Sequence, residues 1–266
     1  MANLCFVGAG NMANAIIKGV TASKVIPNEN IFVFDIFQEK AEQTAKNYNI
    51  NACSSADELI EKADIVILAI KPNVFPEFLP QNAEKLKNKN PLIISIAAGK
   101  TIDFISNLLG YNAHLVRVMP NVNAKVSAAM CAYCCNDNVS DAQKAEVEKI
   151  FNATGKIIPL EEKYFPVFGV IAGCAPAYAY MFIDSLARAA VKNGMNKKIA
   201  LEIAAQTVLG SAKLILESDE HPWELVDQVC SPGGTTIEGV TSLQADGFEA
   251  AVTNAVDAAV EKDSRI

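Results

Sequence analysis

Residues 4–13 read LCFVGAGNMA, and this stretch decides the fold. Its first four residues are an apolar run with the length of a buried strand. Gly8, Gly10 and Ala13 then form a GxGxxA pattern at the start of a helical period that continues to residue 20. A strand, a glycine turn and a helix in this order are the context in which the pattern binds a dinucleotide.

The glycine turn is expected to hold the pyrophosphate of that dinucleotide. Gly8 permits the tight turn, Gly10 lets the phosphates approach the backbone, and Ala13 allows close helix packing. Asn11 and Met12 open the helix, so that their amides would face the phosphate charge.

The first half of the chain alternates short apolar runs with polar, helix-forming stretches. The runs lie at 31–34, 65–70, 92–96 and 115–119, and a further strand pair is expected at 127–134 and 156–160. Ser140 is expected to cap the helix between that pair. This rhythm predicts an α/β fold in which a Rossmann-type, doubly wound, mostly parallel sheet occupies residues 1–161.

From residue 162 to 266 the chain is expected to form an all-α domain. Long helical stretches are separated by breaks at 193–196, 218–222 and 231–234. Two alanine-rich apolar stripes, within 183–191 and 201–215, are too extensive for one copy to cover. We therefore predict that this C-terminal domain forms a homodimer. Its substrate-binding role is predicted separately, from the glycine-rich segment at 231–236.

Composition narrows the class of function. The chain is 51% hydrophobic and 20% charged, with a formal net charge of -7, so neither nucleic acid nor an anionic membrane is an expected partner. A small-molecule substrate is the expectation. The charge-free run 165–183 is long enough to cross a bilayer, but its prolines and glycines favour a turn and a buried helix starting near Pro176.

Histidines and cysteines give little support to a metal site. There are two histidines, and Cys131, Cys134 and Cys135 have no second pair of ligands to complete a zinc tetrahedron. No metal is expected. An odd set of seven cysteines favours a reducing, cytoplasmic location.

Asp35 ends the second predicted strand, where a carboxylate can accept hydrogen bonds from the adenosine ribose and repels a 2′-phosphate. Lys40 is the nearest cation, and no arginine follows. The residues therefore lean to NADH over NADPH, although both NAD and NADP remain open. The alternative is that Asp35 only caps the next helix at Gln38.

Other strand ends supply further candidates for the cofactor site. Ala69, Lys71 and Pro72 follow one strand, Ala97 and Ala98 follow the next, and Asn121 follows a third. Ligands of doubly wound sheets bind at the carboxyl ends of the strands, where small residues leave room for a nicotinamide ring. Lys71 could reach phosphate or ribose, or could be a solvated lysine before a proline turn.

Ser231, Gly233, Gly234, Thr235 and Thr236 form the SPGGTT segment, which precedes a helical run. Glycines and hydroxyl residues at a helix N-terminus suit a substrate carboxylate. The alternative is ordinary capping by Thr235 or Thr236.

Taken together, these motifs resemble the pyrroline-5-carboxylate reductase family along nearly the whole chain. The resemblance rests on GAGNMA at 8–13, AIKP at 69–72, SIAAG at 95–99, PAYAY at 176–180 and VCSPGGTT at 229–236. It implies reduction of 1-pyrroline-5-carboxylate to proline with NADPH or NADH, the last step of proline biosynthesis.

The resemblance also implies roles for residues. Backbone amides from Ser231 to Thr235 would hold the substrate carboxylate, and the Thr236 hydroxyl would bind the ring nitrogen. Substrate would lie at a dimer interface between this loop and the neighbouring nucleotide domain. Dimers could assemble further, into a decamer of five dimers.

Two segments depart from the family pattern. Ala172 and Ala175 stand where the family usually has serine and glycine, and the Asn121 loop reads MPNVN. Two alternative functions therefore stay open. One is a β-hydroxyacid dehydrogenase. Enzymes of that family share a required lysine on the first long helix between the domains, and residues 173–185 contain no lysine. The other is a non-catalytic NAD(P)-binding paralogue.

Overall fold

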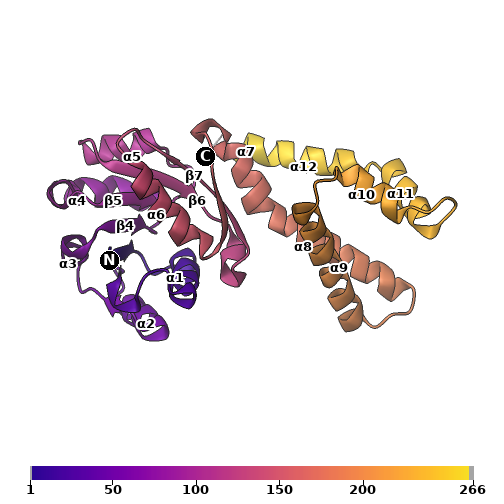
Figure 1. Ribbon diagram of the computed structural model, residues 1–266, viewed down its shortest axis with the longest axis horizontal. Helices are drawn as coiled ribbons and strands as arrows, with labels where there is room; N and C mark the ends of the chain where they lie inside the picture. The colour runs from indigo at the N-terminus through magenta and orange to yellow at the C-terminus, as the bar shows by residue number, and fades with distance from the viewer. Residues whose placement is uncertain (1, 264–266) are drawn as a thin grey trace. The chain divides into compact units, whose positions relative to one another are not determined.

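The computed structural model describes residues 2–263, which form two compact units (Figure 1). The first unit runs to Gly173, and the second begins at Cys174. A functional boundary after residue 161, inside the first unit, stays a prediction.

The first unit is built on one sheet with the strand order β3-β2-β1-β4-β5-β6-β7-β8. The strands are β1 (Leu4–Val7), β2 (Ile31–Phe34), β3 (Asn51–Ala52), β4 (Ile65–Leu68), β5 (Leu92–Ser95), β6 (His114–Met119), β7 (Ala129–Cys135) and β8 (Gly155–Pro159). All neighbours pair in parallel except β6 and β7. The predicted doubly wound, mostly parallel sheet is confirmed, and the order reverses between β1 and β4, the position at which such folds bind ligands.

Helices cover both faces of this sheet (Figure 1). On one face pack α1 (Asn11–Ser23), α2 (Gln38–Tyr48) and α6 (Asp141–Asn152), and on the other α3 (Ala56–Lys62), α4 (Phe75–Lys89) and α5 (Ile102–Leu109). The strands alternate to supply both cores: in β1, Leu4 and Phe6 face the first set of helices, and Cys5 and Val7 face the second. Ser140 caps α6 in a capping box with Gln143, as predicted.

Near the end of the first unit lies the short helix α7 (Phe165–Phe168), whose Phe165 is buried, and a π-helix at Gly169–Cys174 follows it directly. Arg117 of β6 holds this segment by two contacts. Its Nη1 donates to Oε1 of Glu162 at 2.9 Å, and its guanidinium lies 4.4 Å from the centroid of the Phe165 ring. The same Glu162 oxygen accepts a bond from the amide of Ile102, so one carboxylate joins the end of the sheet to α5.

The second unit is wholly helical in its described part. Its helices are α8 (Ala175–Lys192), α9 (Lys197–Glu217), α10 (Pro222–Val229), α11 (Thr235–Ala245) and α12 (Phe248–Asp263). The helix expected near Pro176 is confirmed, since Pro176 lies in the first turn of α8. Small residues let α8 and α9 pack closely, and the buried ones there are Ala187, Ala200 and Ala204.

Much of the apolar surface of these helices remains exposed. Met181 is 70% exposed, Leu209 62% and Leu216 81%. Two stretches, Glu162–Lys192 and Lys197–Glu217, are long and apolar enough to cross a membrane by length and composition, and about 11% of each is buried. An apolar face of this extent is also what a second protein chain covers in an oligomer.

Candidate functional site

Two glycines shape the turn between β1 and α1 in different ways. Gly8 has a φ of +106°, its amide donates to the carbonyl of Phe34 at 2.7 Å, and a Cβ there would lie 2.6 Å from the carbonyl oxygen of Ala69. Gly10 begins α1 in an extended conformation, without a side-chain cap, and a Cβ there would meet no atom within 4 Å. Gly8 thus makes the turn possible, while Gly10 leaves the helix amides open to a ligand.

Asp35 follows β2 and faces the same turn. Its Oδ2 accepts a bond from the amide of Ala9 at 2.8 Å, and its Oδ1 accepts one from the amide of Phe37 at 3.0 Å. The alternative that Asp35 caps α2 is wrong, because the capping residue is Phe37 and no side chain bonds there. The carboxylate instead links the glycine turn to the loop after β2.

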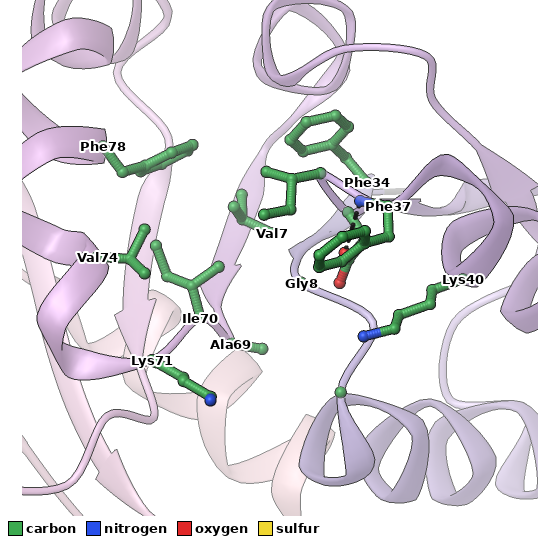
Figure 2. Close-up of a pocket in the computed structure, with 13 residues that line it drawn as sticks. Val7, Gly8, Phe34, Phe37, Lys40, Ala69, Ile70, Lys71, Val74 and Phe78 are labelled. Carbon is green, nitrogen blue, oxygen red and sulfur yellow. Dashed lines mark hydrogen bonds between the residues drawn. The ribbon is translucent and has the colours of Figure 1, made fainter.

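A cavity of about 340 Å³ opens at this edge of the sheet. Its lining residues are Val7, Gly8, Gly10, Phe34, Asp35, Ile36, Phe37, Lys40, Ala69, Ile70, Lys71, Val74 and Phe78. Figure 2 shows Ile70, Val74 and Phe78 on one wall and Phe34 and Phe37 on the other, with Lys40 and Lys71 entering from opposite sides. Apolar walls with a few polar groups fit a nucleotide base and its ribose.

The structure brings together five predicted cofactor residues in this cavity: Gly8, Gly10, Asp35, Ala69 and Lys71. Asn11 and Met12 open α1 beside it, and Pro72 follows Lys71 directly. Ala97 and Ala98 follow β5 at the same edge, outside the lining. Their contacts with a cofactor stay predictions.

Asn121 is engaged within the protein. It is 6% exposed, its Nδ2 donates to the carbonyl of Ala172 at 2.9 Å, and its Oδ1 accepts from the amide of Met130 at 3.3 Å. Its amide therefore bonds within the protein, and a contact of Asn121 with the cofactor stays a prediction. Ala172 itself is buried, and Ala175 opens α8.

Sequence reasoning missed the wall formed by Ile70, Val74 and Phe78. Val74 and Phe78 are four residues apart at the start of α4, so their helical spacing was a usable signal.

Both histidines serve local structure. Nδ1 of His114 lies 2.7 Å from the carbonyl oxygen of Asn138. His221 caps α10, where its Nδ1 accepts from the amide of Trp223, and the amide of His221 donates to Oε2 of Glu224 at 2.8 Å. Neither imidazole lines the cavity of Figure 2.

Three cysteines, Cys5, Cys53 and Cys131, are buried, and Cys134 and Cys135 are half-buried. Burial raises the pKa of the Cys134 thiol to about 12 and that of the Cys131 thiol to about 11. Thiols that stay protonated are poor nucleophiles and poor metal ligands. Within residues 2–263, no group of three histidine, cysteine or carboxylate side chains is placed to hold a metal ion.

The second predicted site lies in the helical unit. After α10, the amide of Gly234 donates to the carbonyl of Ser231 at 2.9 Å, and Gly233 has a φ of +66°, which favours glycine. Gly234 then begins α11 with no side-chain cap, so the alternative of capping by Thr235 or Thr236 is wrong. Thr235 is exposed and Thr236 half-buried. The first amides of α11 are thereby left to bind a ligand.

Comparison with known proteins identifies the family. A family model described as pyrroline-5-carboxylate reductase dimerisation matches residues 162–266, and one described as NADP oxidoreductase, coenzyme F420-dependent, matches residues 3–99. The pyrroline-5-carboxylate reductase of Escherichia coli (strain K12) is 42% identical over 263 residues, covering 98% of this chain and 97% of that protein.

Solved structures agree with the sequence comparisons. A pyrroline-5-carboxylate reductase from Coxiella burnetii has a TM-score of 0.94 at 29% identity, covering 99% of this chain and 98% of that one. The Plasmodium falciparum pyrroline carboxylate reductase, solved with NADP bound, has a TM-score of 0.86 at 35% identity, with coverages of 98% and 97%.

The strand order, the glycine turn and the acid after β2 define a dinucleotide-binding oxidoreductase. Within that class, the chain belongs to the pyrroline-5-carboxylate reductase family. The resemblance expected from the motifs is confirmed.

Proposed function

We propose that this chain reduces the cyclic imine 1-pyrroline-5-carboxylate to L-proline with NADH or NADPH, in the last step of proline biosynthesis. The start of α11 carries the proposal, because a glycine-rich turn there leaves a helix N-terminus without a side-chain cap. In a chain of this family, such a terminus suits the carboxylate of the substrate.

Carboxylate binding falls to the amides of Ser231, Gly233 and Thr235 in the segment from Ser231 to Thr235, while the amide of Gly234 donates within the turn. The turn is held by the bond between Gly234 and Ser231, so the segment needs little reorganisation when it binds an anion. The partial positive charge of the α11 N-terminus adds to the attraction.

Thr236 is the catalytic residue of this proposal. Its hydroxyl, half-buried in the first turn of α11, has no hydrogen-bond partner among the described residues and is free to bind the ring nitrogen. A cyclic imine is readily protonated, and the resulting iminium needs orientation more than a strong acid. This agrees with the structural use of both histidines.

The cavity at the edge of the sheet is the proposed cofactor site. Gly10 and the uncapped start of α1 fit a pyrophosphate, and the apolar walls fit a base. When bound there, the reduced nicotinamide supplies the hydride for the imine carbon.

The helical unit is proposed to form a homodimer. It leaves large apolar side chains exposed, as Leu216 at 81% illustrates, and it matches the dimerisation model of the family. A decamer of five dimers is the larger assembly that we propose. Light scattering on the purified chain should give a mass of two or ten copies, and a monomer would contradict the proposal.

A cytoplasmic location completes the proposal. All seven cysteines are free, which suits a reducing compartment.

Steady-state kinetics of Thr236→Ala tests the assignment. The variant should lose about 10- to 100-fold in kcat/KM, because one hydrogen-bond partner of the reacting nitrogen is removed, with unchanged dissociation constants for the cofactors. Thr235→Ala is the matched control, since it keeps the backbone amide and should lose less than about threefold. A Thr236→Ala variant that keeps the full rate, or that loses cofactor affinity alone, would overturn the role of Thr236.

A further inference from the structure

We infer that this chain selects NADH over NADPH and that Asp35 is the residue that determines the choice. The inference rests on the proposed function, since it concerns the cofactor of that reaction. Family membership does not decide it, because NADH and NADPH carry the same hydride and differ at the 2′ position of the adenosine ribose. The loop after β2 reads that position in doubly wound folds.

The carboxylate of Asp35 is fixed at this position. Two backbone amides, those of Ala9 and Phe37, hold one oxygen each at 2.8 and 3.0 Å. Each oxygen keeps further lone pairs for a ribose hydroxyl. A carboxylate anchored on both sides cannot swing away without breaking these bonds, so a 2′-phosphate would face a fixed like charge.

The loop also lacks the donors that a 2′-phosphate needs. The amide of Phe37 already donates to Asp35. Ile36, which is 79% exposed, and Phe37, which is 59% exposed, present apolar side chains. Nε2 of Gln38 donates to Glu42 at 3.3 Å. A phosphate here would find no free side-chain donor at positions 36 and 37, whereas the two hydroxyls of an unphosphorylated ribose need only acceptors.

Lys40 is the one cation in the segment 35–40, and the acids outnumber it. Asp35 and Glu39 carry negative charge there. The Lys40 ammonium lies 4.6 Å from the centroid of the Phe37 ring, over its face. Lys71 enters the cavity from the opposite side, on the segment after β4 (Figure 2). Charge and geometry at the end of β2 thus both oppose a phosphate.

Equilibrium titration of the full chain with each reduced cofactor, without substrate, tests the inference. The wild-type protein should bind NADH at least about tenfold more tightly than NADPH. Asp35→Asn removes the charge and keeps one acceptor oxygen, and should bring the two dissociation constants to within about threefold. Glu42→Gln is the matched control, since it removes one negative charge on α2 outside the cavity lining and should leave the ratio unchanged.

Equal or tighter binding of NADPH by the wild-type protein would overturn the inference, and this measurement does not depend on the folding of any variant. An unchanged ratio in a folded Asp35→Asn variant, or an equal change in Glu42→Gln, would remove Asp35 as its cause. Failure of the proposed function is distinguished by turnover: no reduction of the imine with either cofactor refutes the function, while the binding ratio still tests Asp35.

Discussion

Replacing Gly8 by alanine should destabilise the protein, because two features of the turn exclude a side chain. The φ of +106° is one that residues with a Cβ rarely adopt. A Cβ would also lie 2.6 Å from the carbonyl oxygen and 2.9 Å from the carbonyl carbon of Ala69, both backbone atoms of the neighbouring strand end. Relief requires β1 and β4 to separate where Ala69 donates to Val7 at 2.8 Å.

The magnitude follows from these two contributions. An alanine held in an unfavourable backbone region costs about 1–3 kcal/mol, and weakening one backbone hydrogen bond costs about 1 kcal/mol more. The free energy of unfolding should therefore fall by about 2–4 kcal/mol, which lowers Tm by roughly 4–16 °C for a domain of this size.

Gly10→Ala is the matched control for this change. Gly10 has an ordinary φ of -74°, and its Cβ would meet no atom within 4 Å. The free energy of unfolding of the Gly10→Ala variant should stay within about 0.5 kcal/mol of the wild-type value. Its cofactor affinity should fall, because the added methyl group lies where the pyrophosphate approaches the backbone. Thermal unfolding without ligand, with cofactor titration alongside, measures both. A Gly8→Ala protein with wild-type Tm would refute this reading of the turn.

Two further predictions concern stability. The Arg117 side chain is 8% exposed, and Glu162→Ala removes the carboxylate that pairs with it. The free energy of unfolding measured in urea should fall by about 2–4 kcal/mol. Glu161→Ala breaks an ion pair whose members are 68% and 61% exposed and should cost under about 1 kcal/mol; equal costs would contradict the assigned difference. Burial raises the pKa of Cys53 and Cys131 from 9.0 to about 11. The folded chain therefore keeps protons that the unfolded chain releases, so the free energy of unfolding should fall between pH 9 and 11 in reductant. If the Cys53→Ala and Cys131→Ala variants lose as much free energy of unfolding at high pH as the wild-type protein does, the fall belongs to other groups.

Local patterns predicted much of the fold and of the candidate cofactor site. A buried apolar run followed by glycines or by an acid is a pattern of residues adjacent in the chain, so it can be found without the fold. Gly8, Gly10 and Asp35 line the cavity at the strand ends, where this pattern placed them. β3, Asn51–Ala52, is too short to show any periodicity. The antiparallel pairing of β6 with β7 leaves no mark in composition.

Contacts between distant residues were beyond local patterns. Asn121 follows a strand, as many ligand-binding residues do, but its amide reaches the carbonyl of Ala172, which is 51 positions away. Phe78 lines the cavity because α4 packs on one face of the sheet, beside the strand ends that form the rest of the lining. Both depend on tertiary packing, which a period of two or of 3.6 residues does not encode.

Turnover with 1-pyrroline-5-carboxylate tests the proposed activity most directly. Purified, folded, dimeric protein should oxidise NADH or NADPH only when this imine is present, and should form one L-proline for each reduced cofactor consumed. The Thr236→Ala variant should bind cofactor as the wild-type protein does, but it should form product far more slowly. Folded dimer that binds cofactor yet forms no proline with either would contradict the activity proposed for this chain.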